Sequence, residues 1–489
     1  MWNDESTGTR ISFSLDRQLQ GSRSLAMKMP KAAPKPIDPR GGWLTEYEAF
    51  HKRMRKDPAY EFTHGRYLIV EQGKGGLADR IKSMPYYLWL AAKHDRILLW
   101  YWDSPCSVDH YFQPSGDIDW RVRRGEEPWF DEYLDDKVRD RKVMATEPKD
   151  KHDYFTHYVN DAEMESRKGA RYISVIMNHA SLTKGLPELY HAHGDNPEVF
   201  KILLERLFKP SDAVQTMLNQ RRAEMRLVPD RYVGVHLRAR YPGINDVLKR
   251  TNPKSDTEGF TNVTPEVEAE LLKMSMHAIE CTMNRHDEHK QHIARKAEEL
   301  QRQADELRHQ LRSLHVYETG EPAMASVATA EENQNGLVAA EEQTDTLSSS
   351  SSPQGLPVYF ATDTMQVLKL LEDSPDSHHS VRSLPPSDHE KTHFVLGRKG
   401  RNECSEFYET IVDLYLLKES ACIGMGVGGY SMLATMMNGM KCFVFHQHNS
   451  MIERFFDDEG SFFHTPVNQA EGENDSLDKA LPTCVEDEN

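Results

Sequence analysis

The sequence predicts an α/β protein built from two facing Rossmann-like domains. Short apolar runs alternate with helical stretches along most of the chain, which is the pattern of βαβ units with parallel strands. These runs fall into two sets, with a boundary near residues 225–231. We expect an N-terminal arm (1–41), a first Rossmann-like domain (42–228), a second one (229–264 and 354–455), a helical, coiled-coil-like insertion (265–316), an acidic linker (317–353) and an acidic tail (456–489).

The first set begins with a strand, a glycine-rich turn, a helix and a second strand. The apolar run 66–71 predicts the first strand, and the glycines of residues 73–76 predict the turn. A helix follows over 77–93 and a strand over 96–102, which completes a βαβ unit. Further elements of this set are a strand over 172–177 and helices over 197–208 and 212–225.

The second set begins with the apolar run 231–238, which predicts a buried strand. Later strands and helices alternate in the same way. The predicted strands are 357–361, 393–396, 421–424 and 441–446. The predicted helices are 364–372, 404–418 and 429–438.

A long helical segment interrupts the second set. Residues 265–314 contain no Gly and, after Pro265, no Pro. From Ile293 to Leu314, apolar residues recur at alternating spacings of four and three, which defines an a/d seam over three heptads. The seam predicts either pairing with another helix, including self-association, or packing on the domain. Three histidines, His286, His289 and His292, lie on a solvated helix face in our interpretation, with metal binding as the alternative.

Acidic residues are unevenly distributed. The 489-residue chain has 60 Lys and Arg against 77 Asp and Glu, a formal net charge of −17. Residues 317–352 and 455–489 together carry sixteen of the seventeen net negative charges. Both segments bury too little apolar surface to offset ordering entropy, so we predict disorder there. Prolines within 32–39 predict an extended N-terminal arm.

The ordered body is therefore close to neutral. This balance excludes a chain-wide cationic nucleic-acid surface. No apolar run is long enough to predict a transmembrane helix, and the N-terminal residues lack the apolar stretch of a secretory signal. The six cysteines include no CxxC pair, which disfavours a structural zinc site and leaves the redox compartment open.

Four segments carry residues suited to binding an anion. The first is Gly73–Arg80, a glycine turn between strand and helix that brings backbone N–H groups close to a phosphate or sugar. A simple tight turn is the alternative. The second is His236 and Arg238 at the carboxyl end of a buried strand, where ligands bind in open α/β sheets. The Arg fork suits a diphosphate, and a structural salt bridge is the alternative.

The third segment is a strand that ends in Thr362 and Asp363. Asp363 can accept hydrogen bonds from a guanine edge or from ribose hydroxyls, or it can cap a helix. The fourth segment contains Asp413, then a strand, then the glycine-rich turn 424–429 and a helix. Backbone amides of residues 428–431 can form an anion nest at that helix N-terminus. A simple tight turn is the alternative.

Taken in order, the four segments resemble the GDP-fucose-dependent fucosyltransferases, including the protein O-fucosyltransferases and the α1,6- and α1,2-fucosyltransferases. The resemblance covers about residues 67–445 without the insertion and linker. It implies the GT-B arrangement of two Rossmann-like domains, GDP-fucose as donor, a glycan or glycoprotein as acceptor, inverting transfer and no divalent metal or other cofactor. It also implies a Golgi or endoplasmic reticulum lumen.

The resemblance also implies roles for individual residues. Arg238 holds the β-phosphate and His236 shapes the same pocket. Asp363 contacts the guanosine part, with Thr362 nearby, and Asp413 supports the pocket. The turns contribute the remaining donor-binding residues: Gly75, Gly76, Gly428, Gly429, Tyr430 and Ser431.

Two departures from the family concern the acceptor side. Many members have an Asp close after the His-x-Arg motif, whereas here the next acid is Asp246. Asp79 stands where some members have an Asn. Asp79 and Asp246 are accordingly the candidate general bases, and Arg238 is the principal candidate catalytic residue.

Two other functions compete with this prediction. A metal-dependent glycosyltransferase would use Asp117 and Asp119, a DxD triplet that does not follow an apolar strand. A GT-B-fold scaffold without catalysis would use the long helix and the acidic segments to bind partners.

Overall fold

The computed structural model describes residues 42–71, 76–102, 106–122, 130, 132–133, 143–146, 158–177, 181–238, 265–319, 356–363, 365–374, 380–384, 404–426 and 428–446. No helix within these ranges combines the length and the apolar character needed to cross a bilayer. The predicted N-terminal arm, the acidic tail, the strand over 393–396 and the linker after residue 319 lie outside the described residues.

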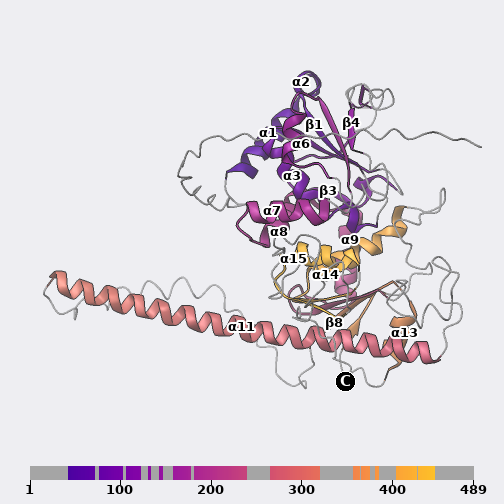
Figure 1. Cartoon of the computed structure of the whole chain (residues 1–489). Helices are drawn as coiled ribbons and strands as arrows, with labels where there is room; N and C mark the ends of the chain where they lie inside the picture. The colour runs from indigo at the N-terminus through magenta and orange to yellow at the C-terminus, as the bar shows by residue number, and fades with distance from the viewer. Residues whose placement is uncertain are drawn as a thin grey trace, which may run out of the picture. The chain divides into compact units, whose positions relative to one another are not determined.

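The first sheet is parallel, with the strand order β2-β1-β5-β4 (Figure 1). Its strands are β1 (Tyr67–Glu71), β2 (Ile97–Tyr101), β4 (Val143–Thr146) and β5 (Tyr172–Ile176). All of β1 is buried, because helices or loops cover both faces of a parallel sheet. The apolar runs that predicted β1, β2 and β5 are explained by this burial, and these three strands are confirmed.

The second sheet has the strand order β11-β10-β7-β8-β9 and is also parallel. Its strands are β7 (Val233–Leu237), β8 (Val358–Thr362), β9 (Val381–Arg382), β10 (Cys422–Met425) and β11 (Phe443–Phe445). The predicted α/β class with parallel sheets is therefore confirmed. The division into two facing domains with the stated boundaries stays a prediction.

The helices and short helical turns surround these sheets (Figure 1). The helices are α1 (Trp43–Lys56), α2 (Pro58–His64), α3 (Met84–Lys93), α6 (Asp161–Ser166), α7 (Leu186–Ala192), α8 (Glu198–Leu207), α9 (Asp212–Glu224), α11 (Pro265–Thr319), α13 (Met365–Asp373), α14 (Tyr408–Lys418) and α15 (Gly429–Asn438). The turns are η1 (Ala78–Arg80), η2 (Val108–His110), η3 (Ser181–Gly185) and η5 (Cys404–Phe407), and a small antiparallel pair joins β3 (Phe112–Pro114) to β6 (Phe208–Pro210).

Helices α14 and α11 cover opposite faces of the second sheet. Val233, Val235 and Leu237 of β7 pack with residues of α11. The alternate residues face α14, where Tyr232 donates a hydrogen bond to the Leu416 carbonyl at 2.6 Å. This alternation follows from the two-residue period of a strand, and it gives the sheet two apolar layers.

Helix α11 has a docked half and a projecting half. Its first half, up to about His286, contributes buried residues such as Leu271 and Ile279 to the core beside β7. Beyond His289, nearly every described side chain is exposed, and Figure 1 shows the helix extending past the sheet. The seam therefore does not lie on the domain, contrary to one of the two predicted arrangements. The helix also continues to Thr319, past the predicted boundary at 316.

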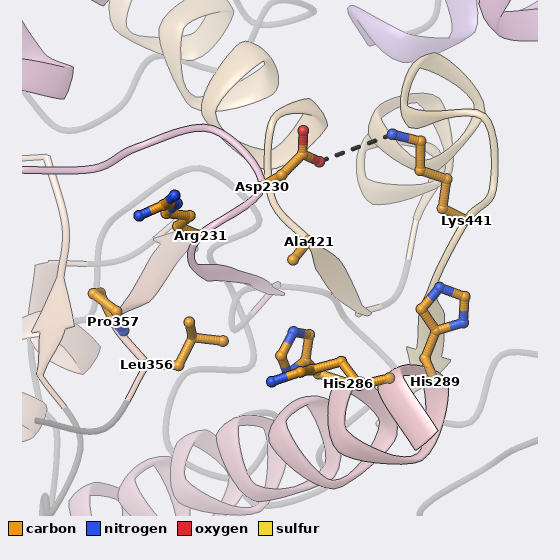
Figure 2. A pocket seen from close by; sticks show the side chains of 9 residues that line it. Asp230, Arg231, His286, His289, Leu356, Pro357, Ala421 and Lys441 are labelled. Carbon is orange, nitrogen blue, oxygen red and sulfur yellow. Dashed lines mark ion pairs between the residues drawn. The ribbon is translucent and has the colours of Figure 1, made fainter. Parts of the chain in front are cut away.

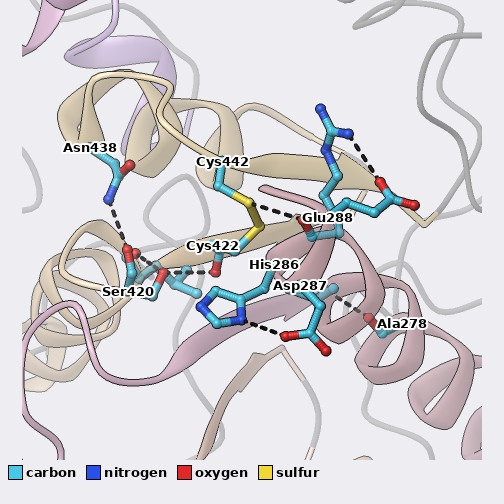
Figure 3. Close-up of a disulfide and its surroundings, with 11 residues drawn as sticks. Ala278, His286, Asp287, Glu288, Ser420, Cys422, Asn438 and Cys442 are labelled. Carbon is cyan, nitrogen blue, oxygen red and sulfur yellow. Dashed lines mark hydrogen bonds and ion pairs between the residues drawn. A yellow bond between two sulfur atoms is a disulfide. The ribbon is translucent and has the colours of Figure 1, made fainter. Parts of the chain in front are cut away.

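The histidines of α11 differ from the predicted solvated face. His286 is buried because it lies in the docked half, beside the strand that begins at Cys422 (Figure 3). Its Nδ1 lies 3.4 Å from Asp287 Oδ1. His292 alone is fully solvated, and no group of three metal-ligating side chains occurs among the residues that the structure describes.

Two disulfides join pairs of cysteines that both lie in the described ranges. Cys106, which follows β2, is bonded to Cys404 at the start of η5. Cys422 of β10 is bonded to Cys442, next to β11 (Figure 3). Cys281 of α11 is disulfide-bonded as well. None of the cysteines in the described ranges is free, so these sulfurs stabilise the fold and hold no metal.

One predicted helix is shorter than expected. The chain after the first glycine turn forms η1 and only then begins α3 at Met84, where Pro85 occupies the first turn. Proline favours that position because its missing N–H needs no partner there. The residues between η1 and α3, including Lys82, therefore form a turn instead of the middle of a helix.

Candidate functional site

Strand register brings three polar segments to the carboxyl edge of the second sheet. His236 pairs with Met425 on one side and with Ala361 on the other. Leu237 pairs with Thr362, so Arg238 and Asp363 follow neighbouring strands at the same level. Ligands of open α/β sheets bind beyond this edge. The predicted proximity of the second, third and fourth segments is explained by this register.

Arg238 lies against the turn that begins α15. Gly428 precedes the helix with φ 105°, a conformation that side chains disfavour. A Cβ atom on Gly428 would also lie 2.8 Å from Arg238 Nη1. Glycine is thus required twice over at this position, and it allows the guanidinium to lie directly beside the helix N-terminus.

Lys82 lies against the next residue of the same turn. A Cβ atom on Gly429 would overlap Lys82 Nζ and would lie 3.3 Å from Asp79 Oδ1. Lys82 comes from the turn after η1, in the part of the chain that carries the first sheet, and its side chain is only 4% exposed. Arg238, which follows β7, and Lys82, from the turn after η1, therefore lie against the consecutive glycines at 428 and 429.

Asp79 partly compensates this positive charge. Its Oδ1 lies 3.0 Å from Lys82 Nζ, and its side chain is 49% exposed. A half-exposed carboxylate is screened by water, so it offsets a buried ammonium incompletely. The N-terminus of α15 adds a partial positive charge at the same place. The arrangement is suited to an anion that accepts hydrogen bonds from a guanidinium, an ammonium and backbone amides.

Arg80 packs against an aromatic ring beside the first sheet. Its guanidinium lies over the Trp102 ring at 5.1 Å from the ring centre. Burial lowers the pKa of Arg80. We interpret Arg80 as a packing residue that anchors η1 to the first sheet.

Aromatic and acidic side chains, most of them buried, pack beneath the turn that begins α15. The Tyr430 ring lies 5.2 Å from the His236 ring, and Tyr430 donates a hydrogen bond to the Thr410 carbonyl. Tyr359 donates a hydrogen bond to the buried Asp413 carboxylate. Burial raises the pKa of both tyrosines well above the usual value, and the charge of Asp413 raises each further. Asp413 is buried and supports the turn from the interior, whereas Tyr430 is half-buried.

Ser431 and Thr362 are also buried. The Ser431 hydroxyl donates to the Gly426 carbonyl at 3.3 Å, which closes the turn between β10 and α15. Asp363 is half-buried and follows Thr362 directly. Gly76 is described at the start of η1, whereas the predicted site residues Gly75 and Asp246 lie outside the described residues.

Lys82 was not among the predicted site residues. Its role depends on contact with Gly429, and local sequence patterns carry no information on contacts between segments so far apart. One signal was available. Lys82 lies three residues after Asp79, which favours an ion pair between the two where the chain is helical, but this spacing does not predict the contact with Gly429.

The DxD triplet has a structural role. Asp119 accepts two hydrogen bonds from Arg121, from Nε at 2.8 Å and from Nη2 at 3.0 Å. Asp117 lies 3.0 Å from Lys52 Nζ. Each carboxylate thus has its own cation, which disfavours the metal-dependent alternative.

A separate cavity of about 760 Å³ lies at the opposite end of the second sheet (Figure 2). Arg231, Pro357 and Ala421, which line it, precede β7, β8 and β10. His289 of α11 also lines it, and burial followed by the positive charge of Arg285 lowers the pKa of His289. This cavity contains none of the predicted site residues.

Comparisons with known proteins give structural similarities alone. No protein-family model matches the chain, and no curated protein is detectably similar to it. A mutant of Arabidopsis thaliana FUT1 in complex with GDP is 12% identical over 90% of this chain and 85% of that one, with a TM-score of 0.44. The α1,6-fucosyltransferase NodZ soaked with GDP-fucose is 14% identical over 76% of this chain and 92% of that one, with a TM-score of 0.36. The fucosyltransferase NodZ from Bradyrhizobium is 14% identical with the same coverage and a TM-score of 0.34. Values this low do not by themselves establish a shared fold or activity.

Proposed function

We propose that the chain is a glycosyltransferase that transfers L-fucose from GDP-fucose to a hydroxyl group of a glycan or protein acceptor. One observation carries the proposal: Arg238 and Lys82 lie against Gly428 and Gly429 at the N-terminus of α15. Two cations and a helix N-terminus provide the charge that a nucleoside diphosphate needs. Fucose as the sugar and guanine as the base are what the resemblance of the four segments to GDP-fucose-dependent fucosyltransferases implies.

In this proposal the reaction inverts the configuration at the sugar carbon. The acceptor oxygen forms a bond to C1 of fucose as the bond from C1 to the β-phosphate oxygen breaks. GDP leaves with the bonding electrons, and the acceptor proton passes to a base. Negative charge grows on the β-phosphate during this step, and Arg238, Lys82 and the amides of the turn stabilise it where it develops.

The remaining residues position the donor. Asp363 follows β8 beside Arg238, where its carboxylate can accept hydrogen bonds from the guanine edge or the ribose. His236, Tyr430 and Asp413 keep the turn rigid from below. Preorganisation of this kind matters because a loosely held donor group stabilises the leaving phosphate less.

Asp79 is the general base that this geometry favours. Its carboxylate is half-exposed at the same turn and forms an ion pair with Lys82. A base must be deprotonated and within hydrogen-bond reach of the acceptor hydroxyl. Asp246 remains the second candidate.

We further propose that the reaction needs no divalent cation, because Lys82 and Arg238 supply the two positive charges that a metal ion otherwise brings to a diphosphate. The bonded cysteines also favour an oxidising compartment,. That environment agrees with the expected Golgi or endoplasmic reticulum lumen.

The proposal is tested by measuring GDP release from GDP-fucose, with and without added acceptor glycans. We expect turnover that survives EDTA and that falls about a hundredfold in Arg238→Ala. The matched control is Arg206→Ala, which removes an arginine on α8 whose side chain is 56% exposed. Equal rates for Arg238→Ala and the parent chain would contradict the proposal, and GDP binding without any turnover would favour the scaffold.

A further inference from the structure

The projecting half of α11 carries a row of exposed apolar side chains. Seven large apolar residues are exposed among the residues that the structure describes, and four of them lie on this one helix face: Ile293, Leu300, Leu307 and Leu311. Their side chains are between 50% and 66% exposed. Soluble proteins rarely leave such a regular apolar row uncovered, so the row indicates an interaction surface.

The spacing of the row defines a coiled-coil register. Ile293, Leu300 and Leu307 occupy d positions, and Ala297, Ala304 and Leu311 occupy a positions. The a and d residues of a heptad form the contact seam with a partner helix. The partner must therefore be a helix with a matching seam of about 27 Å, given a rise of 1.5 Å per residue.

We propose that the partner is a second copy of α11, paired antiparallel about a two-fold axis near Arg302. In this register, Ala297 faces Leu307 of the second copy and Ala304 faces its Leu300. Ile293 likewise faces Leu311. Every alanine then meets a leucine, which fills the seam evenly. A parallel pair would instead place alanine against alanine in two layers and leave the seam poorly packed.

The charges beside the seam also allow this pairing. The flanking e positions are Ala294, Gln301 and Arg308, and the flanking g positions are Lys296, Gln303 and Gln310. In the antiparallel register, Lys296 faces Gln310 of the second copy and Arg308 faces its Ala294. Gln301 and Gln303 each face the same residue of the second copy. No pair of like charges is brought together, whereas like charges at flanking positions are the usual barrier to self-association.

Several charged residues of α11 pair with one another along the helix, away from the a and d positions. Arg308 lies 2.9 Å from Asp305, and Arg285 lies 3.2 Å from Glu288. Gln303 donates to Glu299 at 2.8 Å. These i,i+3 and i,i+4 pairs keep the projecting half helical before it meets its partner. They also leave the apolar seam as the surface that gains most from pairing.

Sedimentation of the full chain tests this inference. We expect a reversible, concentration-dependent mass that approaches twice the 56.3 kDa of the monomer. The variant Leu300→Glu with Leu307→Glu places four carboxylates in the paired seam, so we expect a monomer at every concentration. The control Arg295→Gln with His309→Glu makes the same change in net charge on the outer face and is expected to remain a dimer.

Circular dichroism shows whether the variants stay folded, which we expect because the substituted side chains are exposed. A parent chain that sediments as a monomer up to its solubility limit would overturn the inference. Retention of the dimer in the Leu300→Glu, Leu307→Glu variant would overturn it too, because the interface would then lie elsewhere.

Cysteine cross-linking tests the orientation. In the antiparallel pair, Leu300→Cys combined with Ala304→Cys forms a disulfide between the copies under mild oxidation, whereas Leu300→Cys alone does not. Efficient cross-linking of Leu300→Cys alone would show a parallel pair and overturn the proposed register. The described cysteines are already bonded, so the parent chain serves as the blank.

Discussion

A buried lysine beside the N-terminus of a helix is unfavourable on its own, because the helix dipole repels a cation there. Lys82 lies beside Gly429 and near Arg238, and its one ion pair, with Asp79, is half-exposed. In the proposed function, a bound diphosphate would supply negative charge beside these cations. We infer that part of the binding energy of the donor comes from relief of this repulsion.

Buried histidines make the stability of the fold depend on pH. Burial lowers the pKa of His446 from 6.5 to about 4, even though its Nε2 donates to the His236 carbonyl at 3.1 Å. Between about pH 4 and pH 6.5, His446 is therefore mostly protonated in the unfolded chain and mostly neutral in the folded chain,. The stabilising contribution is complete above about pH 6.5 and is lost as the pH falls toward 4,.

We predict that His446→Gln reduces this acid sensitivity. Glutamine can still donate to the His236 carbonyl but does not titrate. Between about pH 7.5 and pH 5, the free energy of unfolding should fall by about 2 kcal/mol less in the variant than in the parent chain. Urea unfolding at the two pH values measures this difference. Identical losses in the two proteins would show that His446 is not the titrating group.

A glycine in β10 allows helix α11 to approach this strand closely. Gly424 is a buried residue of β10, and a Cβ atom there would overlap Thr282 Oγ1 of α11. Thr282 is fully buried and donates to the Ala278 carbonyl at 2.7 Å. The docked half of α11 can therefore lie directly on β10 only because residue 424 has no side chain.

We predict that Gly424→Ala destabilises the fold by about 1–3 kcal/mol through overpacking. The second substitution Thr282→Ala removes the overlapping oxygen, so the double variant should recover part of this loss. Thermal unfolding of the two single variants and the double variant gives the coupling energy. Additive losses would mean that the helix does not contact the strand at this point.

Elements with strong local patterns could be predicted from the sequence. The strands β1, β2, β7 and β10 are largely apolar runs that are soon followed by glycine or polar residues, so their positions could be predicted from composition. The break between η1 and α3 was missed, although Pro85 is a sequence signal for the start of a helix,. Helix α1 lay outside the predicted elements, since many charged residues dilute its apolar positions.

The residues of the candidate site that lie at strand ends could be predicted from the sequence, whereas Lys82 could not. His236, Arg238, Thr362 and Asp363 lie at strand ends, and parallel strands place their carboxyl ends at one edge. Lys82 depends on a contact between the turn after η1 and the start of α15. Such contacts are set by how two separate parts of the chain pack, and a single sequence does not encode them in any local pattern.

The disulfide between Cys106 and Cys404 joins segments that are 298 residues apart, whereas Cys422 and Cys442 are only 20 residues apart. Closing a longer loop removes more entropy from the unfolded chain. We predict that Cys106→Ala with Cys404→Ala lowers the free energy of unfolding by roughly 2 kcal/mol more than Cys422→Ala with Cys442→Ala.

Chemical denaturation of both double variants under non-reducing conditions tests this order. Both pairs lose two buried or nearly buried sulfurs, so each serves as a control for the other. A larger loss for the Cys422 and Cys442 pair would show that local packing, and not chain connectivity, dominates.

The charge of the whole molecule does not prevent donor binding. Most of the net charge of −17 belongs to the two acidic segments of the sequence. Charges beyond about 8–10 Å are largely screened at physiological salt. The local field at the first turn of α15 is thus set by Arg238, Lys82 and Asp79, which lie against that turn.

Calorimetric titration with GDP tests the central claim most directly. We predict one binding site per chain, with affinity reduced at least tenfold in Lys82→Met and in Arg238→Ala, because each variant loses a charge-assisted hydrogen bond. Gly429→Ala should act like Lys82→Met, because the added Cβ displaces the ammonium. Gly116→Ala is the matched control, since its Cβ would meet only ordinary contacts from 3.6 Å. No binding of GDP to the parent chain, or equal affinity in all variants, would contradict the assignment of this turn as the donor site.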